Sequence, residues 1–225
     1  MMKRRLIACT MQMDVIRYVM RQYHRKIPIA WISRTFHNQK QILHAKIQDF
    51  INCSQDADEI LLSYGLCGNA VLGLRSEKTK LVVPNFDDCI SQLLYTDRKR
   101  PHKRIAFTEK GCYYLTREWT MDQEAIVPQC QKICQMYGED NGRQIIQQIY
   151  SGYHSLVLLD TGAYDVAEIH DYAKQGALYT GMQVRVEKGS CDIMKKLILR
   201  NYDQTIAVFE PGEKITRQRL TGISL

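Results

Sequence analysis

The sequence predicts an α/β protein with a mainly parallel sheet, helices on both faces of that sheet and Rossmann-like layering. Short apolar runs of strand type alternate with segments of helical spacing along almost the whole chain, which is the pattern of a parallel sheet covered by helices. The 225 residues can bury one core of ordinary size, and 45% apolar and 24% charged residues are typical of a globular protein. We therefore predict a single α/β domain over residues 1–225, with a strand order that the pattern leaves open.

Four apolar runs predict the strands of the first half of the chain. They cover residues 5–10, 27–32, 58–63 and 80–84. Apolar side chains at three- and four-residue steps predict helices between and after these strands. The helices begin at Asp14, run from about Ile42 to Ile51, and run from Cys89 to Leu94. A helix-like segment, residues 70–74, also follows the third strand.

The second half of the chain continues the alternation after a basic segment, residues 97–104, that we expect to be an exposed connection. Apolar runs predict strands at residues 111–116, 156–160, 182–186 and 205–209. Helical spacing predicts two helices within 123–150, broken near 138–142, one helix that ends at about Gly176, and one from Ile193 to Leu199.

Charge and hydropathy limit the classes of partner. The net charge of +7 is spread over several short basic segments, which is more typical of a solvated surface than of a nucleic-acid interface. No run approaches the ~18 apolar residues of a membrane span, and Gln12, Asp14 and Arg17 interrupt the apolar stretch near the start. We expect a cytoplasmic protein that binds a small molecule or cofactor, with no membrane contact, no nucleic acid, and a protein partner or a second copy left open.

Polar and thiol side chains follow most of the predicted strands. In open α/β sheets the ligand lies beyond the carboxyl ends of the strands, so these residues are expected on one rim. They are Cys9, Thr10, His37, Asn38, Tyr64, Cys67, Asn69, Asp87, Asp88, Cys89, Thr116, Trp119, Asp160 and Thr161.

Three of the eight cysteines, Cys9, Cys67 and Cys89, follow predicted strands. Cys67 and Cys89 are also expected near helix starts, where the positive end of the helix stabilises a thiolate. Three thiolates with His37 as a fourth ligand would suit zinc, an iron–sulfur cluster or another thiophilic centre. Asp88 would then orient a ligand or cap the helix.

Two other interpretations of these cysteines stay open. Free cysteine packs as a small hydrophobe, so all three can be structural. Alternatively Cys67 or Cys89 is a nucleophile activated by His37, which makes these three residues the catalytic candidates. Cys130 and Cys134 share one helix face and are expected in the core, and we expect Cys53, Cys112 and Cys191 to be structural because they lack polar neighbours in the sequence.

A glycine turn after the strand at 156–160, Asp160-Thr161-Gly162, resembles a site for a phosphate or ribose. Such a turn before a helix can hold an anion. The chain has neither a P-loop motif nor a dinucleotide fingerprint, which disfavours both of those enzyme classes. Residues of this turn, with Asn69 and Asp88, are the candidates for contacting a cofactor.

The chain resembles a family of prokaryotic proteins known only as a domain of unknown function. The resemblance is carried by Tyr64-Gly65-Leu66-Cys67-Gly68-Asn69, by Asp88-Cys89-Ile90 and by Tyr113-Tyr114-Leu115-Thr116-Arg117-Glu118-Trp119. It spans nearly the full chain and strengthens the fold and the site without giving a reaction. The resemblance implies that relatives occur in anaerobes that use corrinoid methyl transfer.

The preferred hypothesis is a protein whose cysteine-rich strand-end site binds a metal, an iron–sulfur cluster or a metal-bearing cofactor, in anaerobic one-carbon or corrinoid-dependent metabolism. The ligands would be Cys9, Cys67, Cys89 and His37. The alternative is a metal-free thiol-dependent enzyme or binding protein for a small anionic metabolite. In that case the turn at Asp160 would hold the anion.

Overall fold

The computed structural model describes residues 2–97 and 106–221, and in it the chain is an α/β protein with mostly parallel strands. Its strands form two sheets, whereas the sequence pattern predicted one. The chain divides into two compact units. Unit 1 combines the residues up to Phe107 with those from Cys191 onward, and unit 2 runs from Thr108 to Ser190. Each unit has its own sheet and is described by itself.

Unit 1 is built on a five-stranded sheet of order β2-β1-β3-β4-β8. The first four strands are parallel, and β8 pairs antiparallel with β4. The strands are β1 Arg4–Cys9, β2 Ile29–Ile32, β3 Glu59–Leu62, β4 Lys80–Pro84 and β8 Ile206–Phe209. Because β1, β3 and β4 are neighbours, the segments that follow these three strands emerge side by side at one rim.

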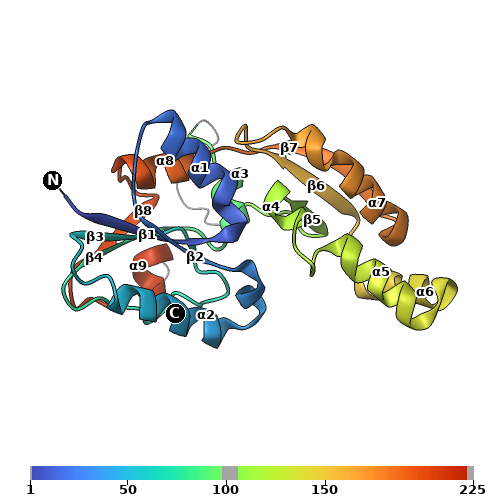
Figure 1. Ribbon diagram of the computed structural model, residues 1–225, viewed down its shortest axis with the longest axis horizontal. Helices are drawn as coiled ribbons and strands as arrows, with labels where there is room; N and C mark the ends of the chain where they lie inside the picture. Colours follow the sequence, from blue (N-terminus) through green and yellow to red (C-terminus); the bar gives the residue numbers. More distant parts are fainter. Residues whose placement is uncertain (1, 98–105, 222–225) are drawn as a thin grey trace. The chain divides into compact units, whose positions relative to one another are not determined.

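Helices cover both faces of the sheet of unit 1. In Figure 1, α1 and α8 lie on one side of it and α2 on the other. The central strand β3 is buried along its full length, as expected for a parallel strand covered on both faces. The helices of unit 1 are η1 Thr10–Gln12, α1 Met13–Gln22, η2 Arg34–Asn38, α2 Lys40–Asn52, α3 Cys89–Leu94, α8 Asp192–Leu199 and α9 Arg217–Thr221.

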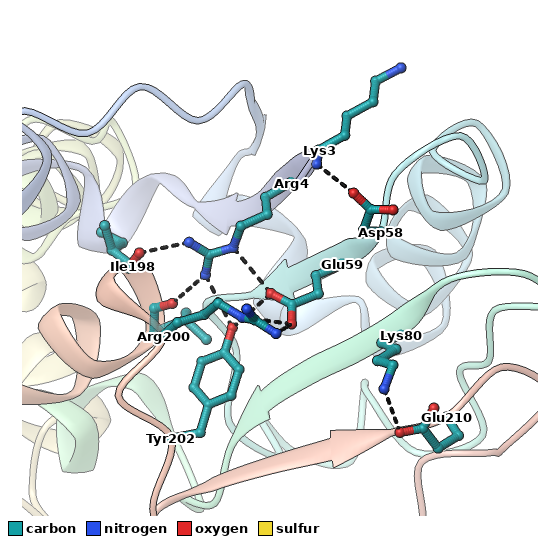
Figure 2. A network of polar contacts seen from close by, with 10 residues as sticks. Lys3, Arg4, Asp58, Glu59, Lys80, Ile198, Arg200, Tyr202 and Glu210 are labelled. Carbon is teal, nitrogen blue, oxygen red and sulfur yellow. Dashed lines mark hydrogen bonds and ion pairs between the residues drawn. The ribbon is translucent and has the colours of Figure 1, made fainter. Parts of the chain in front are cut away.

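An ion-pair network around the buried carboxylate of Glu59 lies at the opposite rim, where β1 and β3 begin (Figure 2). The Glu59 carboxylate accepts from Arg4 Nε at 3.2 Å, Arg200 Nε at 3.0 Å and the Tyr202 hydroxyl at 3.1 Å. Arg4 also donates to two carbonyls at the end of α8, including that of Ile198 at 2.8 Å. Arg4 therefore satisfies carbonyl groups that a helix end leaves without partners, and it ties α8 to the sheet.

Unit 2 has a three-stranded parallel sheet of order β5-β6-β7. Its strands are β5 Cys112–Leu115, β6 Ser155–Asp160 and β7 Gln183–Lys188, and its helices are α4 Arg117–Thr120, α5 Ile126–Tyr137, α6 Glu139–Ile149, η3 Val166–Ile169 and α7 His170–Thr180. Leu156 and Leu158 of β6 pack in one apolar core with Ile126 and with Cys130 and Cys134 of α5. The core position predicted for these two cysteines is confirmed.

The structure corrects one expected element and leaves another outside its description. No helix follows β3: residues 70–74 form turns instead. Residues 98–105, most of the expected basic connection, lie outside the described residues. Within the described parts of the chain, no helix has both the length and the apolar character needed to cross a membrane.

Candidate functional site

The three strand-end cysteines lie at the ends of three adjacent strands. Cys9 is the last residue of β1, Cys67 lies in the loop after β3, and Cys89 follows β4 and begins α3. All three are buried free thiols. The sheet order of unit 1 therefore places the three cysteines at one rim, as the sequence predicted.

Cys9 contacts His37 across the sheet rim. The Sγ atom of Cys9 lies 3.2 Å from Nε2 of His37, which is in η2 after the neighbouring strand β2. The Cys9 sulfur also accepts from the backbone N–H of Met11 at 3.4 Å and so caps the 3₁₀ turn that follows β1. The hydroxyl of Ser63 accepts from the backbone N–H of Cys9 at 3.1 Å. Cys9 is thus fixed by contacts from three segments.

Cys67 is held in a left-handed turn. Its φ is +45°, and Gly68 and Asn69 follow with φ of +65° and +75°. Such conformations cost of order 1–3 kcal/mol for a residue other than glycine, and they cluster at ligand sites. Within the helix expected at residues 70–74, Gly73 has a φ of +85°, which a right-handed helix does not allow because it needs negative φ at each residue. The expected stabilisation of Cys67 by a helix start was therefore wrong.

The Cys67 turn is tied closely to the segment before α3. The backbone N–H groups of Leu66 and Cys67 donate to the carbonyls of Phe86 and Asp87, both at 2.8 Å. A Cβ on Gly65 would lie 2.4 Å from the Phe86 carbonyl oxygen, so only glycine allows this approach. The backbone N–H of Cys89 lies close enough to the Cys67 sulfur to lower its pKa. Cys67 and Cys89 are thereby brought together.

Cys89 begins α3, and the preceding residue caps the helix. The carboxylate of Asp88 accepts from the backbone N–H of Ser91 at 2.6 Å, which confirms the helix start predicted at Cys89. Burial raises the pKa of Asp88 above its ordinary value of 3.8, against the effect of its hydrogen bonds with Ser91. The Asp88 charge in turn raises the pKa of both Cys67 and Cys89.

Electrostatics keep the cluster neutral. Burial raises the pKa of Cys9, and the nearby Cys89 raises it further. Burial likewise raises the pKa of Cys67 and of Cys89, and each of these thiols is also disfavoured as an anion by another cysteine of the group. Burial, and then Arg34, lowers the pKa of His37. Without a cation, the site consists of protonated thiols beside a neutral imidazole.

Tyr64 was expected on this rim, but the sequence assigned it no role. It is 1% exposed, and its hydroxyl has no hydrogen-bond partner in the described part of the chain. Its pKa is raised by burial and then by Cys9, Cys67 and Cys89, which places the phenol beside all three thiols. An unmet buried hydroxyl costs about 1–3 kcal/mol. An unmet polar group next to the thiols therefore marks a place where a ligand would gain a hydrogen bond.

The other candidate residues have polar partners of their own or belong to unit 2. Asn69 is exposed, and its side chain accepts from Arg217. Asp160, Thr161 and Gly162 belong to unit 2, whereas the cysteines belong to unit 1. The Asp160 carboxylate pairs with Lys188 at 2.8 Å, a contact that lowers its pKa, and also accepts from the backbone N–H of Gly162 at 3.2 Å. The Lys188 side chain thus already contacts the turn that was predicted to bind an anion.

Cys112 has polar neighbours that its sequence context did not indicate. Its Sγ atom lies 3.3 Å from a guanidinium nitrogen of Arg185 and 3.6 Å from the carboxylate of Glu109. Arg185 also donates to Glu109 at 2.6 Å. Arg185 belongs to β7, two strands away from β5 in the sheet order, so the expectation that Cys112 lacks polar company was wrong.

The thiol cluster is not a preformed metal centre. Among the described residues, no group of three or more His, Cys, Asp and Glu side chains is arranged to hold a metal ion. The donor set itself, three thiols and one imidazole, is nevertheless one that zinc and iron–sulfur centres use. The residue types fit a thiophilic ligand, and their positions would have to close around it.

Fold and site together define a class: an α/β protein with a buried thiol cluster at the carboxyl ends of parallel strands. Comparison with protein-family models then gives the family. Residues 31–198 match the model described as "Protein of unknown function (DUF1638)", and the chain belongs to this family. The matched segment contains His37, Cys67 and Cys89 and begins after Cys9. Comparison with curated proteins and with solved structures found no match.

Proposed function

We propose that this protein binds a thiophilic metal ion, an iron–sulfur cluster or a metal-bearing cofactor at the rim of unit 1, through Cys9, Cys67, Cys89 and His37. The observation that carries the proposal is the convergence of these residues from four separate segments, with the Cys9 sulfur 3.2 Å from His37 Nε2. Soft thiolates and a neutral imidazole are the donors that zinc and iron–sulfur centres prefer.

The protonation states support this proposal. A neutral His37 has a lone pair available for a metal. The pKa values of the three thiols are raised by burial first and by a neighbouring cysteine second. A bound cation would stabilise the thiolate forms against both effects, and binding would release the thiol protons.

Backbone strain at Cys67 gives a second line of support. The chain adopts three successive positive φ angles at Cys67, Gly68 and Asn69, and a Cβ on Gly65 would collide with the Phe86 carbonyl. Strain of this kind is expected where a loop must present a ligand side chain in one orientation.

The same observations disfavour the metal-free alternative. A nucleophilic cysteine acts as a thiolate, but burial keeps Cys67 and Cys89 protonated. The turn at Asp160, which would hold an anionic metabolite, already contains the Lys188 pair. On the sequence resemblance alone, we extend the proposal to anaerobic one-carbon or corrinoid-dependent metabolism. The helices on both faces of the sheet of unit 1 also support Rossmann-like layering for that unit.

Metal analysis with a visible spectrum, on protein purified without oxygen, tests the proposal. We expect bound metal in the wild-type protein and a loss of that metal in Cys67→Ala. Cys53→Ala is the matched control, because Cys53 is exposed and lies outside the cluster. Metal-free wild-type protein that takes up no zinc, cadmium or iron in reconstitution would contradict the proposal.

A further inference from the structure

A buried pair of amides lies one turn beyond two of the cysteines. The Nε2 atom of Gln12 donates to Oε1 of Gln92 at 3.0 Å, and both residues are only 1% exposed. Gln12 ends η1, the 3₁₀ turn that Cys9 caps, and Gln92 lies in α3, the helix that Cys89 begins. The hydrogen bond therefore joins the segment after β1 to the segment after β4.

Each amide comes three residues after its cysteine. Cys9 is the extended residue that caps η1, and Gln12 is the last residue of that turn. Residues three apart are neighbours on the surface of an α-helix, which places Gln92 on the same side of α3 as Cys89. In the sheet order, β1 and β4 are both neighbours of β3, so the segments after them leave the sheet at the same rim. The bonded amides therefore connect the segment that carries Cys9 with the helix that carries Cys89.

The amide pair destabilises the folded core, because it buries polar atoms that lack hydrogen-bond partners in the described part of the chain. The Oε1 of Gln12 and the Nε2 of Gln92 have no partner among the described residues. Exchanging oxygen and nitrogen in both amides would leave the same number of unmet groups, because one internal bond uses one donor and one acceptor. Each unmet group costs about 1–3 kcal/mol. A pair of leucines would fill a comparable volume without that cost, so stability alone does not account for the pair.

We propose that Gln12 and Gln92 are positioning residues for the thiol site, and that their hydrogen bond sets the separation between Cys9 and Cys89. A directional bond between η1 and α3 fixes one distance, whereas apolar packing allows the two segments to slide. Partners that orient metal ligands in this way typically contribute about 10-fold to 100-fold to metal affinity. The inference rests on the proposed function, because it concerns how the same site holds a metal.

The test is a cadmium titration without oxygen, followed by the sulfur-to-cadmium ultraviolet absorption, together with urea unfolding of the same proteins. The variants are Gln12→Leu, Gln92→Leu and the double variant. Each single variant leaves one buried amide unmet and should lower both stability and cadmium affinity. The double variant removes both amides and should regain stability, while its cadmium affinity stays about 10-fold or more below that of the wild type.

The double variant therefore regains stability without regaining cadmium affinity only if the amide pair positions the cysteines. Recovery of both quantities, or wild-type affinity in either single variant, would overturn the inference and leave the proposed function standing. A wild-type protein without cadmium absorption would overturn both. Gln144→Leu, at an exposed position of α6, should change neither quantity and serves as the control.

Discussion

The sulfur of Cys9 lies 3.2 Å from Nε2 of His37, although the two residues are 28 positions apart in the chain. The contact exists because β1 and β2 are parallel neighbours, with Cys9 in register with Ile32 at the end of β2. The segments after the two strands therefore leave the sheet together. The contact joins the candidate ligand at the end of β1 to the one that follows β2. The other two candidate ligands, Cys67 and Cys89, follow β3 and β4.

The reactivity of the thiols separates the two proposed uses of this cluster. Because burial raises the pKa of Cys9, Cys67 and Cys89, metal-free protein should react with iodoacetamide first at the exposed Cys53 and only slowly at the three cluster thiols. Mass spectrometry of digested protein after increasing reaction times gives the order. Rapid, selective alkylation of Cys67 or Cys89 at neutral pH would instead favour a catalytic nucleophile.

Asp88 should make the protein less stable at neutral pH than at mildly acidic pH. Burial raises its pKa in the folded state above 3.8, so the folded state binds more protons than the unfolded state between those two values. Stability contributed by this group is present below pH 3.8 and is lost as pH rises through the folded-state pKa. Asp88→Asn keeps a good helix cap and should be more stable than the wild type at pH 7, because it removes a charge that burial disfavours.

Unfolding by urea at several values between pH 4 and 7 measures this difference. The gain of Asp88→Asn should shrink as the pH approaches 4, because both states then bind the proton. Asp87→Asn, at the exposed neighbouring position, should gain less, since that charge acts only by raising the pKa of Asp88. A variant less stable than the wild type at pH 7 would mean that the ionised cap is worth more than its burial costs.

The network around Glu59 should be essential for the stability of unit 1. Glu59 and Arg4 have side chains only 3% and 13% exposed, and Glu59→Ala would leave the Arg4 guanidinium buried without its anion. Breaking a buried pair in this way costs about 3–5 kcal/mol. Lys80 and Glu210, drawn beside the network in Figure 2, form a pair that is largely exposed, for which about 0–1 kcal/mol is expected. Urea midpoints of Glu59→Ala and Glu210→Ala that lie close together would contradict this account.

Much of the fold was visible in the sequence, because strand and helix periodicity is a local property. The apolar run before Tyr64 and the helix start at Asp88 were predicted and are present. The division into two sheets was not predicted, because strand pairing depends on contacts between distant segments. The helix expected after Cys67 was wrong, because the positive φ of Gly73 turns the chain within that segment.

The candidate site was predictable only in its residue types. A thiol after each of three strands indicated Cys9, Cys67 and Cys89, and the strand order places them together. The sequence placed Tyr64 on the rim without a role, and it gave no signal for the amides of Gln12 and Gln92. Their importance comes from hydrogen bonds that they lack when buried, which is a property of the folded chain. The polar contacts of Cys112 likewise arise from Arg185 on a distant strand.

The central claim is that three thiols and one imidazole form a single ligand site, and counting thiolates tests it most directly. Cadmium titrated into the wild-type protein without oxygen should give a sulfur-to-cadmium absorption that saturates at one metal per chain with the intensity of three thiolates. About a third of that intensity should be lost in each of the variants Cys9→Ser, Cys67→Ser and Cys89→Ser. His37→Gln should lower the cadmium affinity and leave the intensity unchanged. Cys53→Ser should change neither the affinity nor the intensity. Equal intensity in the wild type and the three cluster variants would contradict the account.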